Sequence, residues 1–181
     1  MGCSPSRSVT IGHKHNGKLG MNDRRIVNDY DKRNVKKTWK ILSKDMPGIG
    51  AKIFLKIFSL KPEIKQIFPF RDCTGEELMR DTHFRGHASR FMQAVGAAVD
   101  NVNDLDTAMT SLLFGLGQQH IHYTGFNVQY FDLFITAMLF VFEKELNIKF
   151  TQEVANSWRL VLEFMISKLK EGYNDAILNK C

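Results

Sequence analysis

The chain has 181 residues, of which 44% are apolar, with 14 Phe and 8 Met but only 4 Pro. This length suits one domain with a single core, and the scarcity of Pro and of alternating Val/Thr-rich runs argues against an all-β fold. The formal net charge is +6, but residues 1–40 carry +7 and the rest of the chain −1. The folded part therefore lacks the basic surface of a nucleic-acid-binding domain, and we expect no nucleic-acid partner.

The N-terminal segment has the pattern of a doubly acylated membrane anchor. Removal of Met1 exposes Gly2, with Ser6 at the position that myristoylation requires, and Cys3 beside it is a candidate for palmitoylation. Two signals matter because a single myristoyl chain gives only marginal membrane binding. Residues 1–30 are otherwise polar, Gly-rich and basic. We expect a flexible tether at the inner leaflet, on the cytoplasmic face of the plasma membrane.

Helices are predicted to begin directly after this tether. Asp31 or Asn34 can cap the first helix, and its apolar face comprises Val35, Trp39 and Leu42. Pro47-Gly48 is expected to end this helix, and a second apolar helix follows through Phe58. Pro62 then suits the first turn of a short third segment that ends at residues 68–70.

Four more helices are predicted in the second half of the chain. Helical periodicity places them at about residues 76–99, 105–122, 128–146 and from 152 onward. Thr151 is the expected N-cap of the last helix and Gly172 its expected end. The pattern predicts an all-α domain of seven to eight helices over residues 31–173, with a short C-terminal tail over residues 174–181.

Two histidines, His87 and His120, lie 33 residues apart on two of these predicted helices, each among apolar and aromatic residues. Helices that each project one imidazole into an apolar slot can hold a flat, metal-bearing ring such as haem. An alternative is a zinc site that adds His83 and His122 to this pair. In this alternative His83 and His87 would point away from the apolar stripe, and no nearby Asp or Glu completes a catalytic zinc site.

Three segments resemble the globin family in order and spacing. KPEIKQIF (residues 61–68) is similar to the short helix and Phe that hold haem in globins. GHASRF (residues 86–91) resembles the globin distal helix, and LGQQH (residues 116–120) resembles the proximal helix. The resemblance covers about residues 31–173. It implies haem b (iron protoporphyrin IX) as cofactor, with His120 as proximal and His87 as distal iron ligand.

The same resemblance implies the other residues of the haem pocket. Phe68 would pack on the porphyrin, Phe54 and Phe91 would take distal positions, and Arg90 would reach a propionate or the ligand. The remaining walls would be formed by Leu116, Phe126, Tyr130, Phe131 and Phe134. Globins usually carry a β-branched residue where Phe91 falls, so this Phe is expected to crowd the distal side.

The lipidation pattern together with this domain resembles globin X and related membrane-associated animal globins. That resemblance implies bis-histidyl, hexacoordinate iron and reversible binding of O2, CO and NO, with a redox or signalling role. Enzymatic alternatives are nitrite reduction, NO dioxygenation or electron transfer, which require an external reductase because the chain has no flavin or nicotinamide motif of its own. A ligand sensor and a simple O2 carrier also remain open.

Overall fold

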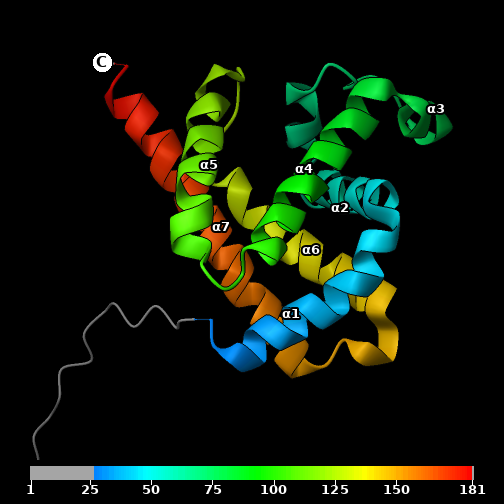
Figure 1. Ribbon diagram of the computed structural model, residues 1–181. Coiled ribbons are helices and arrows are strands. Elements are labelled where there is room, and N and C mark those ends of the chain that lie inside the picture. Colours follow the sequence, from blue (N-terminus) through cyan, green and yellow to red (C-terminus); the bar gives the residue numbers. More distant parts are fainter. Residues whose placement is uncertain (1–26, 181) are drawn as a thin grey trace, which may run out of the picture.

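The computed structural model describes residues 27–180. The predicted acylation sites Gly2 and Cys3, and most of the predicted tether, lie outside these residues. The described part contains seven α-helices and four short 3₁₀ helices and no strand, which confirms the predicted all-α fold class (Figure 1). No helix within it is long and apolar enough to cross a bilayer.

Helix α1 (Asp29–Leu42) begins at a capping box whose N-cap lies three residues before the nearer of the two predicted caps. The Asn28 side chain accepts hydrogen bonds from the backbone N–H groups of Tyr30 (2.8 Å) and Asp31 (3.0 Å). The Asp31 carboxylate in turn accepts from the Asn28 N–H at 3.2 Å. Because this reciprocal pair satisfies backbone donors on both sides, Asn28 is the cap, and the prediction of Asp31 or Asn34 is wrong.

Helix α2 (Met46–Leu60) follows a single 3₁₀ turn, η1 (Ser43–Asp45). Asp45 caps it by accepting from the Gly48 N–H at 3.0 Å, and Pro47 lies in its first turn. The chain therefore breaks next to the predicted Pro47-Gly48 pair, with Pro47 opening the new helix. Pro62 likewise opens η2 (Pro62–Ile67), as its fixed φ angle favours.

Two helices replace the single helix predicted over residues 76–99. Helix α3 (Gly75–Arg80) ends at Asp81, whose backbone is extended (φ −64°, ψ 128°), and α4 (Thr82–Asp100) starts directly after it. The Asp81 side chain accepts from the Phe84 N–H at 2.7 Å. The single-helix prediction is wrong because a helix start with its own cap interrupts the apolar pattern.

The second half follows the predicted order of helices. Helix α5 (Leu105–Gln119) continues into the 3₁₀ turn η3 (His120–His122), and α6 (Tyr130–Leu146) leads through η4 (Asn147–Lys149) to α7 (Gln152–Leu178). Thr151 is confirmed as the N-cap of α7, accepting from the Val154 N–H at 3.4 Å.

The prediction that Gly172 ends the last helix is wrong. This glycine lies buried inside α7. A Cβ built on it would lie 2.0 Å from the backbone oxygen of Phe114 in α5. The glycine thus serves a close helix contact and not a helix end. Residues 174–178 of the predicted tail continue the helix.

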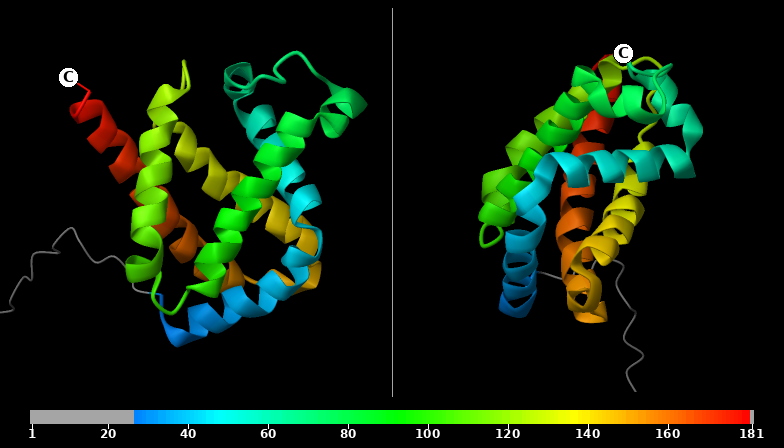
Figure 2. Two further views of the ribbon diagram at one scale, coloured as in Figure 1. Left: turned by 45° about the horizontal axis from the view of Figure 1, so that its top comes forward. Right: turned by 90° about the vertical axis from the view of Figure 1, so that its right-hand side faces the viewer.

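The core joins α1, α2, α4, α5, α6 and α7, and α5 lies beside α7 at one side of the molecule (Figure 2). Trp158 of α7 is fully buried, with its ring 6.1 Å from Trp39 and 4.8 Å from Phe142. Its indole N–H donates to the Thr38 hydroxyl at 2.9 Å. These contacts fix α1 and α6 against α7 at the end of the molecule away from the two histidines.

Candidate functional site

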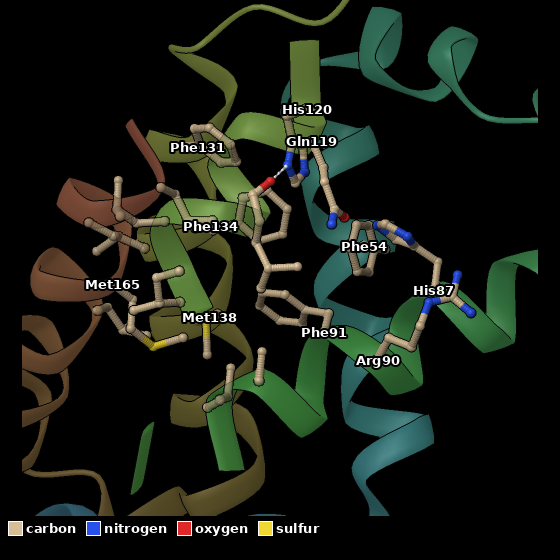
Figure 3. Close-up of a pocket in the computed structure, with 18 of the residues that line it drawn as sticks. Phe54, His87, Arg90, Phe91, Gln119, His120, Phe131, Phe134, Met138 and Met165 are labelled. Atoms are coloured by element: carbon tan, nitrogen blue, oxygen red, sulfur yellow. Dashed lines mark hydrogen bonds between the residues drawn. The ribbon is translucent and has the colours of Figure 1, made fainter. Parts of the chain in front are cut away.

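A cavity of about 250 Å³ lies between α4, α5, α6 and α7, with Phe54 of α2 at one wall (Figure 3). Most of its lining is aliphatic or aromatic. The polar exceptions are His87, Arg90, Gln119, His120 and Tyr123. Eight of the residues predicted from sequence line it: Phe54, His87, Arg90, Phe91, Leu116, His120, Phe131 and Phe134. A largely apolar cleft with a few convergent polar groups is the usual form of a cofactor site.

His87 projects into this cavity from α4. Its ring centre is 4.9 Å from that of Phe54 and 5.0 Å from that of Phe68. Burial, followed by the positive charges of Arg90 and His120, lowers its pKa to about 4. The imidazole is therefore neutral at pH 7, the form that can bind a metal ion. No hydrogen bond to it is formed by any residue that the structure describes.

His120 enters from the end of α5, where the helix passes into η3. Its Nδ1 lies 2.6 Å from the carbonyl oxygen of Leu116, one turn earlier (Figure 3). A carbonyl only accepts, so Nδ1 carries the proton and donates, and Nε2 keeps a free lone pair. Burial lowers the His120 pKa and the Leu116 contact opposes this in part. The hydrogen bond fixes tautomer and ring orientation, as in metal-binding histidines.

The two imidazoles would thus fit as ligands of a haem iron. Both are neutral nitrogen donors, both line one cavity, and its other walls are largely apolar. The zinc alternative finds no support, because residues 27–180 contain no group of three or more His, Cys, Asp or Glu side chains placed to hold a metal ion. His83 and His122, which it required, are both exposed.

Three phenylalanines crowd the His87 side of the cavity. The ring centres of Phe54 and Phe91 are 5.5 Å apart, those of Phe54 and Phe134 5.6 Å, and those of Phe91 and Phe134 5.0 Å. The two contacts of Phe54 are edge-to-face and that of Phe91 with Phe134 is tilted, and aromatic contacts of this kind stabilise a fixed arrangement. The expected crowding by Phe91 is therefore present, with Phe134 as a third member that the sequence did not place on this side.

Three predicted pocket residues do not line the cavity but pack behind the residues that do. Phe68 packs on His87 and stacks on Phe70 at 4.8 Å. Phe126 packs on His120 at 4.8 Å, and Tyr130 lies behind Phe126 at 5.7 Å. Phe68 and Phe126 thus contact one imidazole each from outside the cavity, and Tyr130 contacts neither histidine ring directly.

Several lining residues were not foreseen. Gln119 and Tyr123 flank His120, and Figure 3 shows the Gln119 side chain extending into the pocket. The inner end is lined by Met138 of α6 and, from α7, by Leu162, Met165, Ile166 and Leu169. Helical spacing along α7 places these residues on one face, but the same spacing describes an ordinary core face. Only the arrangement of α7 against α5 shows that they face a cavity.

Comparison with known proteins decides the family. The sequence model described as Globin matches residues 51–169. The chain belongs to the globin family. This globin is 25% identical over 149 residues to neuroglobin of Danio rerio, covering 81% of this chain and 92% of that protein. It is 26% identical over 152 residues to cytoglobin-2 of the same species, covering 83% and 84%.

A solved structure extends the similarity to three dimensions. A hexacoordinated heme protein from an anhydrobiotic tardigrade, determined at pH 4, superposes on this globin with a TM-score of 0.77. The two are 25% identical, and the match covers 84% of this chain and 99% of that one. Family membership and the fold together imply a haem cofactor. The fit of His87 and His120 to such a group agrees with this from the chain's own geometry.

Proposed function

We propose that this globin binds haem b between His120 and His87, with both imidazoles as iron ligands in the resting state. The observation that carries the proposal is the pair of neutral imidazoles in one apolar cavity, with His120 fixed through Nδ1 by Leu116. When bound, the haem supplies an iron centre that takes O2, CO or NO reversibly and exchanges single electrons. The similar tardigrade protein is described as hexacoordinated.

The two histidines are held differently, which suits different roles. His120 has a hydrogen bond that sets its orientation, whereas packing between Phe54 and Phe68 holds His87. A side chain held by packing alone can leave its position without breaking a hydrogen bond. With haem bound, His87 would therefore be the imidazole free to move away for a gas molecule, and His120 would be the fixed one.

Competition with His87 weakens gas binding, because only the fraction of protein with His87 displaced is competent. The contacts of Phe54, Phe91 and Phe134 restrict the space on the same side further. These features favour a redox or signalling role over bulk O2 storage. Nitrite reduction or NO dioxygenation at the same centre would need an electron donor, since the chain carries no second redox cofactor motif.

The proposal includes attachment to the inner leaflet of the plasma membrane, as in globin X. Its support is sequence-based: Gly2 and Cys3 in the acylation pattern, and a charge of +7 within residues 1–40. The basic residues continue onto α1, where Lys32, Lys36 and Lys40 follow one another at helical spacing. Such a surface would attract anionic lipids once acyl chains hold the protein nearby.

Visible absorption of the dithionite-reduced protein without oxygen tests the coordination. We expect sharp, split low-spin bands for the wild type and a broad five-coordinate spectrum for His87→Leu. His83→Leu is the matched control, since His83 is exposed on the same helix and outside the cavity lining. A five-coordinate spectrum in the wild type would contradict the role of His87 as a ligand, and absence of any haem band would contradict haem binding.

A further inference from the structure

Helix α5, which carries His120 at its end, is supported mainly from one side. It packs extensively on α7 and only slightly on α4 (Figure 1). The following turn η3, which contains His120, also contacts α7. The position of His120 relative to the rest of the cavity therefore depends on how α5 and α7 pack together.

The two helices meet backbone to backbone at a pair of glycines. A Cβ on Gly117 of α5 would lie 2.0 Å from the Leu169 carbonyl oxygen, and a Cβ on Gly172 of α7 would lie 2.0 Å from the Phe114 carbonyl oxygen. Both glycines are buried, and each lacks room for any side chain. The contact is reciprocal and lies three residues before His120, so α5 has no freedom to approach α7 more closely.

Polar and aromatic contacts beyond the crossing connect the His120 segment to the last turns of α7. The Gln118 side-chain N–H donates to Asp175 at 2.9 Å, and the Tyr173 hydroxyl donates to the Phe126 carbonyl at 3.3 Å. The Phe126 ring lies 5.7 Å from Tyr173 and 4.8 Å from His120. These α7 residues belong to the part of the helix that continues beyond Gly172.

We propose that the Gly117–Gly172 crossing, together with the α7 turn that carries Tyr173 and Asp175, positions the His120 imidazole for iron binding. This rests on the proposed haem function. Neither glycine lines the cavity itself. Gly117 of α5 and Gly172 of α7 act through the packing of the two helices, so they are positioning residues. A methyl group at either site forces the helices apart by more than about 1 Å, because ordinary carbon–oxygen contacts begin near 3.4 Å.

The test compares Gly117→Ala and Gly172→Ala with Gly115→Ala. Gly115 lies on the same helix two residues from Gly117, and a Cβ there would meet nothing within 4 Å. The readouts are the rate of haem transfer to excess apomyoglobin and the electron paramagnetic resonance spectrum of the ferric protein, whose g values report imidazole orientation. We expect both crossing variants to release haem about 10- to 100-fold faster with shifted g values, and Gly115→Ala to behave as the wild type.

Gln118→Ala is the milder variant, since it keeps both glycines and removes only the bond to Asp175. We expect smaller changes in the same direction. If a crossing variant does not fold, haem release and the g values of Gln118→Ala alone test the proposal. Lower thermal stability with unchanged haem release and g values in the folded variants would overturn the proposal. Failure of the proposed function is distinguishable, because the wild type would then take up no haem at all.

Discussion

His87 shows how a single residue's environment shapes both function and stability. Burial and the charges of Arg90 and His120 lower its pKa to about 4, against an ordinary value of 6.5. The folded apoprotein therefore keeps the imidazole neutral where the unfolded chain has already taken up a proton. This favours iron binding at neutral pH and at the same time makes the empty pocket sensitive to acid.

The consequence for stability has a definite sign. Between pH 6.5 and about 4 the unfolded chain binds more protons at this site, so the free energy of unfolding falls as pH falls through this window. From pH 7 to pH 5 we expect His87 to account for a loss of about 2 kcal/mol in the apoprotein. Urea unfolding of apoprotein at the two pH values measures this loss.

His87→Leu should lose correspondingly less stability over the same interval, whereas His83→Gln, at an exposed position, should match the wild type. An equal loss in the wild type and in His87→Leu would show that the buried imidazole is not responsible.

At the scale of elements, the short break at Asp81 determines where the helix of His87 begins. The Asp81 carboxylate accepts from the Phe84 N–H at 2.7 Å and satisfies a backbone donor that the first turn of α4 would otherwise leave unpaired. We expect Asp81→Ala to lower the free energy of unfolding by about 1 kcal/mol. Asp81→Asn keeps an accepting oxygen and should retain most of this stability.

Asp72→Ala is the control for this change, because Asp72 is exposed and its one ion pair, with Arg71, is a surface contact at 3.7 Å. Chemical denaturation of the three variants provides the comparison. Equal stability of Asp81→Ala and the control would mean that the capping bond contributes nothing to α4.

The same break illustrates what sequence alone predicts in this fold. Apolar periodicity located the helices and the pair His87 and His120, because it reports directly which face of a helix is buried. It did not reveal the start of α4, since aspartate is tolerated inside helices. It also misplaced the end of α7, because Gly172 is required by Phe114 of another helix. Long-range backbone contacts leave no local pattern.

One part of the candidate site could likewise be predicted from the sequence, and another part could not. The aromatic residues near the two histidines could be predicted from their motifs, and the cavity lining contains Phe54, Phe91 and Phe131 as expected. The inner end, with Met138 and Met165, could not be predicted, because a residue facing a cavity and one facing the core have the same spacing. The missing information was the distance between helices, which is set by side chains and glycines far apart in the sequence.

At the scale of the whole molecule, basic residues are concentrated at the N-terminal end of the chain. The first forty residues carry a net charge of +7, and five of their ten Lys and Arg residues lie on α1, which packs into the core. The family match begins at residue 51, and none of residues 27–40 lines the cavity. The proposed contact with an anionic membrane surface would use this charge without involving the residues around the cavity.

Substitution of Gly2 tests that role in cells. Gly2→Ala removes the only residue that can accept myristate in the pattern, so we expect the protein to move from the membrane to the soluble fraction on centrifugation. Cys3→Ser keeps myristate and the basic segment, and should give weaker, reversible attachment. Gly12→Ala, within the same segment, should leave the distribution unchanged.

If a Gly2→Ala/Cys3→Ser double variant remained with the membranes, attachment would have to come from the basic residues or the folded domain. High salt separates these two cases, because it weakens attraction between lysine or arginine and anionic lipid but strengthens apolar contact. Release of the double variant by salt would retain the basic segment as the membrane contact without acylation. Retention in high salt would place the contact on the folded domain, and the acyl anchor would be contradicted.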